Sequence, residues 1–192
     1  CVAKILCDEE KKEEVVIVTS NRILKAQKIS ENSIRLAMGE PIFEWKIIPL
    51  SKNIDHKKIN LRINDLELKD GFALNVGNPH IVFFVDDCFK YNLNKIGPLI
   101  ENHEMFPEKI NVTFAQIKDS TNILVNVWER VAGLTKACGT AACATGVVAF
   151  EKKLAGNNTN IHFKDGFLNI KYNHVISMTG PVSNIKEISI KL

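Results

Sequence analysis

The sequence contains no hydrophobic run long enough to cross a lipid bilayer, which takes about 20 consecutive apolar residues in a helix. Its longest apolar stretch without a charged residue, residues 137–150, is rich in Ala and Gly and is shorter than that. The start of the chain also lacks the basic and apolar pattern of a secretory signal. We therefore expect no membrane partner and interpret residues 137–150 as a buried helix.

A block of like charges is also missing. The 25 basic and 22 acidic residues are spread along the chain, and the formal net charge is +3. Proteins that bind nucleic acid instead gather Lys and Arg into a stripe along the phosphates, so nucleic acid is not an expected partner. The 45% of hydrophobic and 24% of charged residues are close to the average for globular proteins, which argues against a disordered or fibrous chain.

The cysteines form no paired framework and no Cys-x-x-Cys motif. An odd number at irregular spacing, without a signal peptide, predicts free thiols in a reducing cytoplasm. No second pair of ligands has a spacing suited to zinc, so we expect no metal site. The five cysteines are Cys1, Cys7, Cys88, Cys138 and Cys143.

Short β-branched and apolar runs recur along the chain and predict strands separated by turns such as Thr19-Ser20-Asn21 and Asp70-Gly71. Two later segments predict helices. The first is residues 93–101, although Gly97-Pro98 weakens it, and the second is residues 139–154, which Gly156 should end as a C-terminal cap. The predicted strands are 15–19, 23–29, 33–38, 59–63, 72–76, 81–85, 110–117 and 123–128, with further strands over 161–192.

The order of strands, one uniformly apolar helix and more strands lacks the β-α alternation of a doubly wound sheet, so we expect an α+β fold. A helix with apolar residues on every face must be surrounded, which predicts a curled mixed or antiparallel sheet wrapped around it. A helical pattern at residues 2–6, followed by its own strands, indicates a second and incomplete copy of this unit. We assign residues 1–42 to the N-terminal unit, 43–180 to the C-terminal unit, and 181–192 to a strand that returns to the first.

The segment from Trp128 to Cys143 carries the clearest chemical signal, because it places Cys138-Gly139-Thr140 at the start of the apolar helix. A helix N-terminus carries partial positive charge and unpaired N–H groups, so it favours a thiolate and binds anions. Cys138 is therefore a candidate base with a lowered pKa. The N–H groups of Gly139 and Thr140 are candidates to hold a carboxylate. The alternative is that Cys138 is a small buried apolar residue.

Several motifs, taken together and in order, resemble the diaminopimelate epimerase family. Any one tetrapeptide would be weak evidence, whereas the series runs from the first residue of the chain to the last. The family's first catalytic cysteine opens a Cys-Gly-Asn-Gly-x-Arg-Cys motif, and Cys1 resembles its last residue. The other matches are Met38-Gly39-x-Pro41, Gly77-Asn78-Pro79-His80, Phe106-Pro107, Asn111-Val112, Glu129-Arg130, Gly133-x-Thr135, Ala137-Cys138-Gly139-Thr140 and Thr179-Gly180-Pro181.

The resemblance implies a cofactor-independent epimerase that interconverts LL- and meso-diaminopimelate, in the synthesis of lysine and peptidoglycan precursors. Without an aldehyde cofactor to stabilise the carbanion, such an enzyme relies on positioned acids and bases and on electrostatics. Two thiols on opposite faces of the α-carbon invert it, and Cys138 is one of them. The other should lie six residues before Cys1, so we expect an upstream segment and expect the chain alone to be inactive.

The resemblance also assigns roles around the thiols. His80 and Glu129 would act beside them in catalysis, and Glu129 would also contact substrate. The residues implied to bind substrate are Asn78, Asn111, Glu129, Arg130, Gly139 and Thr140. Taken alone, His80 would be read as a loop histidine, Glu129 as a surface ion pair with Arg130, and each Asn as a turn residue or cap.

Three positions depart from the family pattern: Val131, Leu134 and Ala141 stand where Gly, Glu and Gly are common. Val131 puts the loop geometry in doubt, because Gly adopts backbone angles that Val disfavours. We interpret Trp128 and Cys143 as packing residues. By resemblance we expect a cytoplasmic homodimer without cofactor. The alternatives are a related racemase or phenazine-type isomerase, and a truncated form that binds without catalysis.

Overall fold

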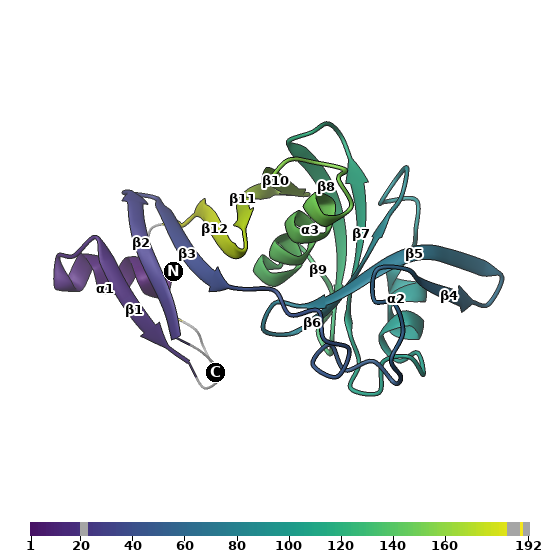
Figure 1. Ribbon diagram of the computed structural model, residues 1–192. Helices are drawn as coiled ribbons and strands as arrows, with labels where there is room; N and C mark the ends of the chain where they lie inside the picture. The colour runs from purple at the N-terminus through teal and green to yellow at the C-terminus, as the bar shows by residue number, and fades with distance from the viewer. Residues whose placement is uncertain (20–22, 184–188, 190–192) are drawn as a thin grey trace.

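The computed structural model describes residues 1–19, 23–183 and 189, so the predicted turn at 19–21 and most of the predicted strand at 181–192 lie outside it. Twelve described strands form one open mixed sheet, in the order β1-β2-β3-β12-β11-β10-β8-β7-β6-β5-β4, with β9 added beside β8 (Figure 1). Of the described strand pairs, β8 with β10 and β6 with β7 are parallel and the others are antiparallel. The predicted α+β class is confirmed. The strands are β1 Glu14–Val18, β2 Ile23–Ser30, β3 Ser33–Gly39, β4 Ile59–Ile63, β5 Leu66–Asn75, β6 Pro79–Phe84, β7 Asn111–Ile117, β8 Asn122–Glu129, β9 Gly133–Thr135, β10 Asn158–Phe163, β11 Gly166–Asn173 and β12 Val175–Pro181.

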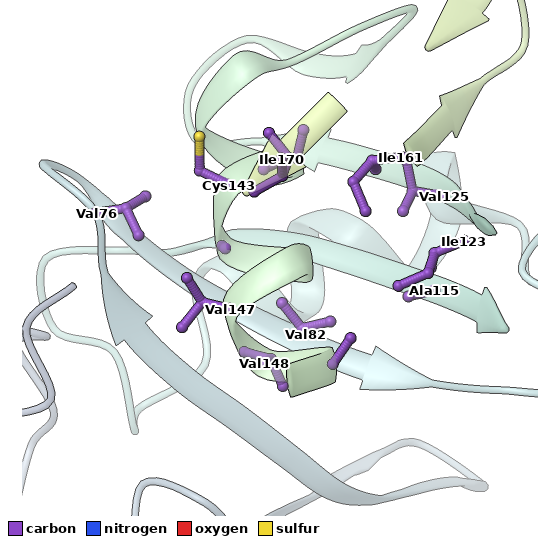
Figure 2. Packing of buried hydrophobic residues seen from close by; sticks show 14 of the residues in the cluster. Val76, Val82, Ala115, Ile123, Val125, Cys143, Val147, Val148, Ile161 and Ile170 are labelled. Atoms are coloured by element: carbon purple, nitrogen blue, oxygen red, sulfur yellow. The ribbon is translucent and has the colours of Figure 1, made fainter. Parts of the chain in front are cut away.

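Helix α3, Gly139–Glu151, is the central helix that the apolar stretch predicted. Every residue from Ala141 to Ala149 is buried, and strands from both halves of the sheet surround it (Figures 1 and 2). Small residues allow this close approach: a Cβ added to Gly146 would lie 2.8 Å from Cγ2 of Ile170 on β11. The helix is therefore held by packing on all sides.

Helix α2, Leu93–Glu101, packs with a second core on the strands β4 to β8. Phe114 lies at the centre of that core, with its ring stacked 4.6 Å from Tyr91 and 5.7 Å from Phe83, centroid to centroid. Strand β7 is buried on both faces, since Phe114 belongs to this core and Ala115 to the core around α3. The middle of the sheet is thus a rigid layer between two helices.

Helix α1, Val2–Glu10, packs on β1 and β2 at one end of the sheet, where Ala3, Cys7 and Ala26 form a small third core. Strand β12 pairs antiparallel with β3 on one side and with β11 on the other, so it joins the α1 end of the sheet to the strands around α3 (Figure 1). The division at residues 42 and 180 remains a prediction.

Two local expectations were wrong. Helix α3 ends at Glu151 rather than Leu154. Lys153, with φ 57°, adopts the left-handed conformation that was expected of Gly156. The N–H of Leu154 donates to the Ala149 carbonyl at 2.8 Å. Strand β5 also continues through Asp70-Gly71, because Asp70 with φ 54° forms an irregularity opposite β4 and its N–H is bound by the Asn60 side chain at 2.9 Å. No helix among the described residues is long and apolar enough to span a membrane.

Candidate active site

Cys138 is the N-cap residue of α3, with extended backbone angles of φ −143° and ψ 114°, and is 6% exposed. Its Sγ lies 3.4 Å from the Thr140 hydroxyl oxygen. The position before the helix, predicted from the sequence, is confirmed. Gly139 follows under the Met178 side chain, where an added Cβ would lie 3.1 Å from Sδ. The N–H groups of the first turn, which a helix leaves without a partner in its own hydrogen-bond ladder, therefore begin directly beside the thiol.

The pKa of the Cys138 thiol is raised to about 11, chiefly by burial and also by the neighbouring Glu129 carboxylate, as a hydrogen-bond partner and as a charge. The Thr140 hydroxyl and the Ala141 N–H act in the opposite direction. The expectation of a lowered pKa was therefore wrong, because desolvation outweighs the helix N-terminus. At neutral pH this thiol is protonated. It is a proton donor beside a carboxylate rather than a ready base.

Three of the predicted side chains lie in one row across the sheet. His80 on β6 is the register partner of Asn111 on β7. Val112 is the partner of Trp128, so the same antiparallel register places Asn111 opposite Glu129 on β8. Residues side by side on neighbouring strands point to the same face. The row His80, Asn111 and Glu129 therefore comes from three strands held between two helices.

His80 is fully buried, and its Nε2 lies 3.0 Å from Oδ1 of Asn78, while its buried Nδ1 has no hydrogen-bond partner among the residues that the structure describes. Burial, together with the charge of Arg130, lowers the pKa of His80 to about 3. The ring is therefore neutral at physiological pH. With the Asn78 oxygen facing Nε2, that nitrogen carries the proton and Nδ1 is left as an acceptor.

Asn111 joins this row to the turn after β8. Its amide donates to the Pro79 carbonyl at 2.7 Å, and its Oδ1 accepts the backbone N–H of Arg130 at 2.9 Å. The Arg130 guanidinium donates from Nη1 to the Glu108 carbonyl at 2.9 Å. Asn78, His80, Asn111 and Arg130 are thus linked to one another, and Cys138, Glu129 and Thr140 form the neighbouring group.

The turn after Glu129 contains the first departure from the family pattern. Val131 has φ 71° and is 83% exposed, so it adopts the left-handed conformation that suits Gly. Leu134 is 46% exposed on β9, and Ala141 is fully buried in α3. These last two replacements fit their surroundings without strain.

Sequence reasoning missed Glu101 and treated Trp128 only as a core residue. Glu101 is 4% exposed at the end of α2 and accepts a hydrogen bond from Trp128 Nε1 at 2.7 Å. The available signal was an acidic residue directly after the apolar Leu99 and Ile100 in the predicted helix. Among the described residues, no group of three or more His, Cys, Asp or Glu side chains could hold a metal ion.

Solved structures of similar fold include a probable proline racemase from Agrobacterium radiobacter K84 and a hydroxyproline epimerase from Agrobacterium vitis. The first has 13% identity and a TM-score of 0.67 and covers 100% of this chain and 66% of that chain. The second has 12% identity and a TM-score of 0.67, with 95% and 62% covered. At such identities the likeness shows the fold, which is that of a class of racemases and epimerases.

The sequence comparisons are more specific. The family model described as Diaminopimelate epimerase matches residues 72–185. A diaminopimelate epimerase of Pelagibacter ubique is 47% identical over 100% of this chain and 72% of its own length, and one from the Wolbachia of Drosophila simulans is 40% identical over 95% and 70%. The chain therefore belongs to the diaminopimelate epimerase family and is an isomerase.

Proposed function

We propose that this protein interconverts LL- and meso-diaminopimelate by proton transfer between two thiols, on the route to lysine and peptidoglycan precursors. The observation that carries the proposal is Cys138, a buried and protonated thiol at the start of α3. Family membership supports the substrate, and the same resemblance supports a cytoplasmic homodimer.

In one direction of the reaction, Cys138 donates its proton to one face of the α-carbon while a thiolate removes the α-proton from the other face. The S–H bond breaks, a C–H bond forms, and Cys138 is left as a thiolate. The Thr140 hydroxyl and the Ala141 N–H, which act against the raised pKa, then stabilise that thiolate. In the other direction Cys138 must first lose its proton, and the Glu129 carboxylate lies next to it as the acceptor.

The remaining residues would hold the substrate. The reacting carboxylate would bind the N–H groups at the start of α3, around Gly139 and Thr140, where the helix favours an anion. Asn78, Asn111 and Arg130 would hold the distal amino-acid end, and the planar guanidinium suits a carboxylate. Neutral His80 would accept a hydrogen bond at Nδ1, the buried atom that has no protein partner.

The test follows stereochemistry and α-deuterium together when LL-diaminopimelate is incubated in deuterated water. The proposed second thiol lies six residues before Cys1, so the 192-residue chain is compared with a version extended upstream to include the Cys-Gly-Asn-Gly-x-Arg segment. We expect inversion only with the extended version. Inversion by the unextended chain would contradict the two-thiol mechanism, and inversion by neither would favour a protein that binds without catalysis. Inversion of proline but not of diaminopimelate would indicate the related racemases.

A further inference from the structure

A buried carboxylate that this mechanism does not use lies at the end of α2. Glu101 is the last residue of that helix and is 4% exposed. Its Oε2 accepts the Trp128 Nε1 proton at 2.7 Å, its Oε1 accepts the Val131 backbone N–H at 3.0 Å, and Lys109 Nζ lies 3.8 Å from Oε1. A buried carboxylate is costly, and the negative end of a helix disfavours an acid further. The helix itself therefore gains little from having Glu at this position.

The residue that Glu101 binds through its backbone is the strained one. Val131 is β-branched and has φ 71°, a combination that costs of the order of 1–3 kcal/mol. Its side chain is 83% exposed, so burial does not offset that strain. A contact outside the turn must hold the backbone in place, and the bond from the Val131 N–H to Glu101 is such a contact.

Each backbone N–H group of residues 130–132 in this turn has a hydrogen-bond acceptor. The N–H of Arg130 is bound by Asn111 at 2.9 Å, that of Val131 by Glu101, and that of Ala132 by the Glu129 carbonyl at 3.1 Å. Asn111 belongs to the neighbouring strand and the Glu129 carbonyl to the turn itself. Of these three acceptors, Glu101 is the one that comes from α2.

Helix α2 also packs directly against the strand residue that precedes Glu129. A Cβ added to Gly97 would lie 2.4 Å from Cδ2 of Trp128, so only a residue without a side chain fits there. The same indole is fixed at its other side by the hydrogen bond to Glu101. The end of β8 is thus fixed by an apolar contact and by a carboxylate from one helix.

We propose that Glu101 is a positioning residue for the epimerase site. By binding Trp128 and Val131 it holds the turn in the conformation that places Glu129 beside Cys138 and Arg130 beside Asn111. The effect of Glu101 on catalysis rests on the proposed function, since Glu101 positions Glu129 and Arg130, to which that function assigns roles. Glu101 itself does not contact the reacting atoms.

The first test measures kcat and KM of Glu101→Gln in a chain that carries both proposed thiols. The single carbonyl oxygen of Gln cannot accept both the Trp128 and the Val131 N–H, and the amide nitrogen accepts neither, so one of the two bonds is lost. The turn is then held less firmly, and kcat/KM should fall roughly 10- to 100-fold, the loss expected when reacting groups are misplaced by about an ångström. Glu104→Gln, on an exposed residue in the same segment, is the matched control and should be unchanged.

Adding Val131→Gly supplies the rescue, because Gly adopts a positive φ without strain and needs no external bond to stay there. The kcat/KM of the double variant should be severalfold higher than that of Glu101→Gln alone. A Glu101→Gln protein with unchanged kcat and KM, or a loss that Val131→Gly does not reduce, would overturn the proposal. Should Glu101→Gln fail to fold, Glu101→Asp, whose shorter side chain cannot reach both donors, allows the same comparison.

The second test needs no turnover and uses the 192-residue chain. Since the Glu129 carboxylate raises the pKa of Cys138, releasing the turn should lower that pKa, and Val131→Gly should restore it. Thiolate absorbance is titrated with and without Cys138→Ala to isolate this thiol. An unchanged Cys138 pKa in Glu101→Gln would overturn the positioning role. If the chain that carries both proposed thiols does not epimerise diaminopimelate, the proposed function fails, and this titration on the 192-residue chain still decides the role of Glu101.

Discussion

Helices α1 and α3 both begin directly after a cysteine, yet their surroundings differ almost completely. Cys1 before α1 is exposed, and the helix carries charges on its outer face. Cys138 before α3 is 6% exposed, and the helix has no charged residue before Glu151. The same local position thus gives one solvent-exposed thiol and one whose pKa is raised by burial to about 11. A helix N-terminus alone does not decide the chemistry of a thiol; the layers packed around it do.

The largest expected effect separates two cysteines on α3 itself. Cys138→Ala should lower epimerase activity by about 10²- to 10⁴-fold, the usual contribution of a positioned acid or base. Cys143→Ala should retain most activity, because Cys143 is fully buried within the helix and packs in the core around it. Both predictions are checked by measuring steady-state epimerisation rates of diaminopimelate, with each substitution made in a chain that carries both proposed thiols. Equal losses would contradict the assigned roles.

Cys1 and Cys138, the thiols that precede α1 and α3, can be compared directly by their rates of alkylation with iodoacetamide, with mass spectrometry of the peptides identifying the modified residue. The thiolate is the reactive form, and with a pKa near 11 its fraction at pH 8 is of the order of 10⁻³. Cys138 should therefore react far more slowly than exposed Cys1, and its rate should still rise about tenfold between pH 8 and pH 9. Glu129→Gln removes a cause of the raised pKa and should speed the reaction at pH 8. A rate at Cys138 that levels off below pH 9 would contradict the burial argument.

The next comparison concerns stability. Gly146→Val should lower the free energy of unfolding by about 1–3 kcal/mol, since the added atoms would overlap Ile170 in a core with no room. Glu9→Ala on the exposed face of α1 should change it by less than about 0.5 kcal/mol. Urea unfolding of both variants gives the two values. Similar losses of unfolding free energy in Gly146→Val and Glu9→Ala would show that α3 is not packed more tightly than the exposed face of α1.

Local patterns predicted the elements well and the contacts between them poorly. The apolar run of β4 and the small apolar residues of α3 are local signals; β4 formed where expected, and α3 began where expected but ended three residues early. The partners of Glu101 lie 27 and 30 residues away, so no spacing rule could find them. The raised pKa of Cys138 was missed for the same reason: it depends on strands distant in sequence that exclude water. Lys153 and Asp70 show that positive φ is not confined to Gly, because hydrogen bonds close the helix end around Lys153 and the Asn60 side chain binds the Asp70 N–H.

The smallest expected effect lies on α1, where ion pairs join the helix to its strands beside a small core. Lys4 Nζ bonds Asp8 at 2.7 Å and Glu31 at 3.1 Å, and Lys28 contacts the same two carboxylates. Hydrogen bonds from Lys28 and Lys4 lower the pKa of Asp8, and those from Lys4 and Lys28 lower the pKa of Glu31. The stabilisation is therefore present above the ordinary carboxyl pKa values and is lost as the pH falls through the lowered ones.

Lys4→Met keeps the buried stem of the side chain and removes its charge, so it should cause a small fall in Tm at neutral pH and low salt. High salt should narrow the difference in Tm from the unaltered protein, because the carboxylate partners of Lys4 are exposed and salt screens their charge. Acid should narrow it as well, since the carboxylates are then protonated. Lys12→Met is the matched control: the Lys12 side chain is 64% exposed and pairs with Glu10 at the end of α1, so the Tm of this variant should barely change. A fall in Tm for Lys4→Met that is independent of salt and pH would show that Lys4 acts by packing, as the residues of α3 do.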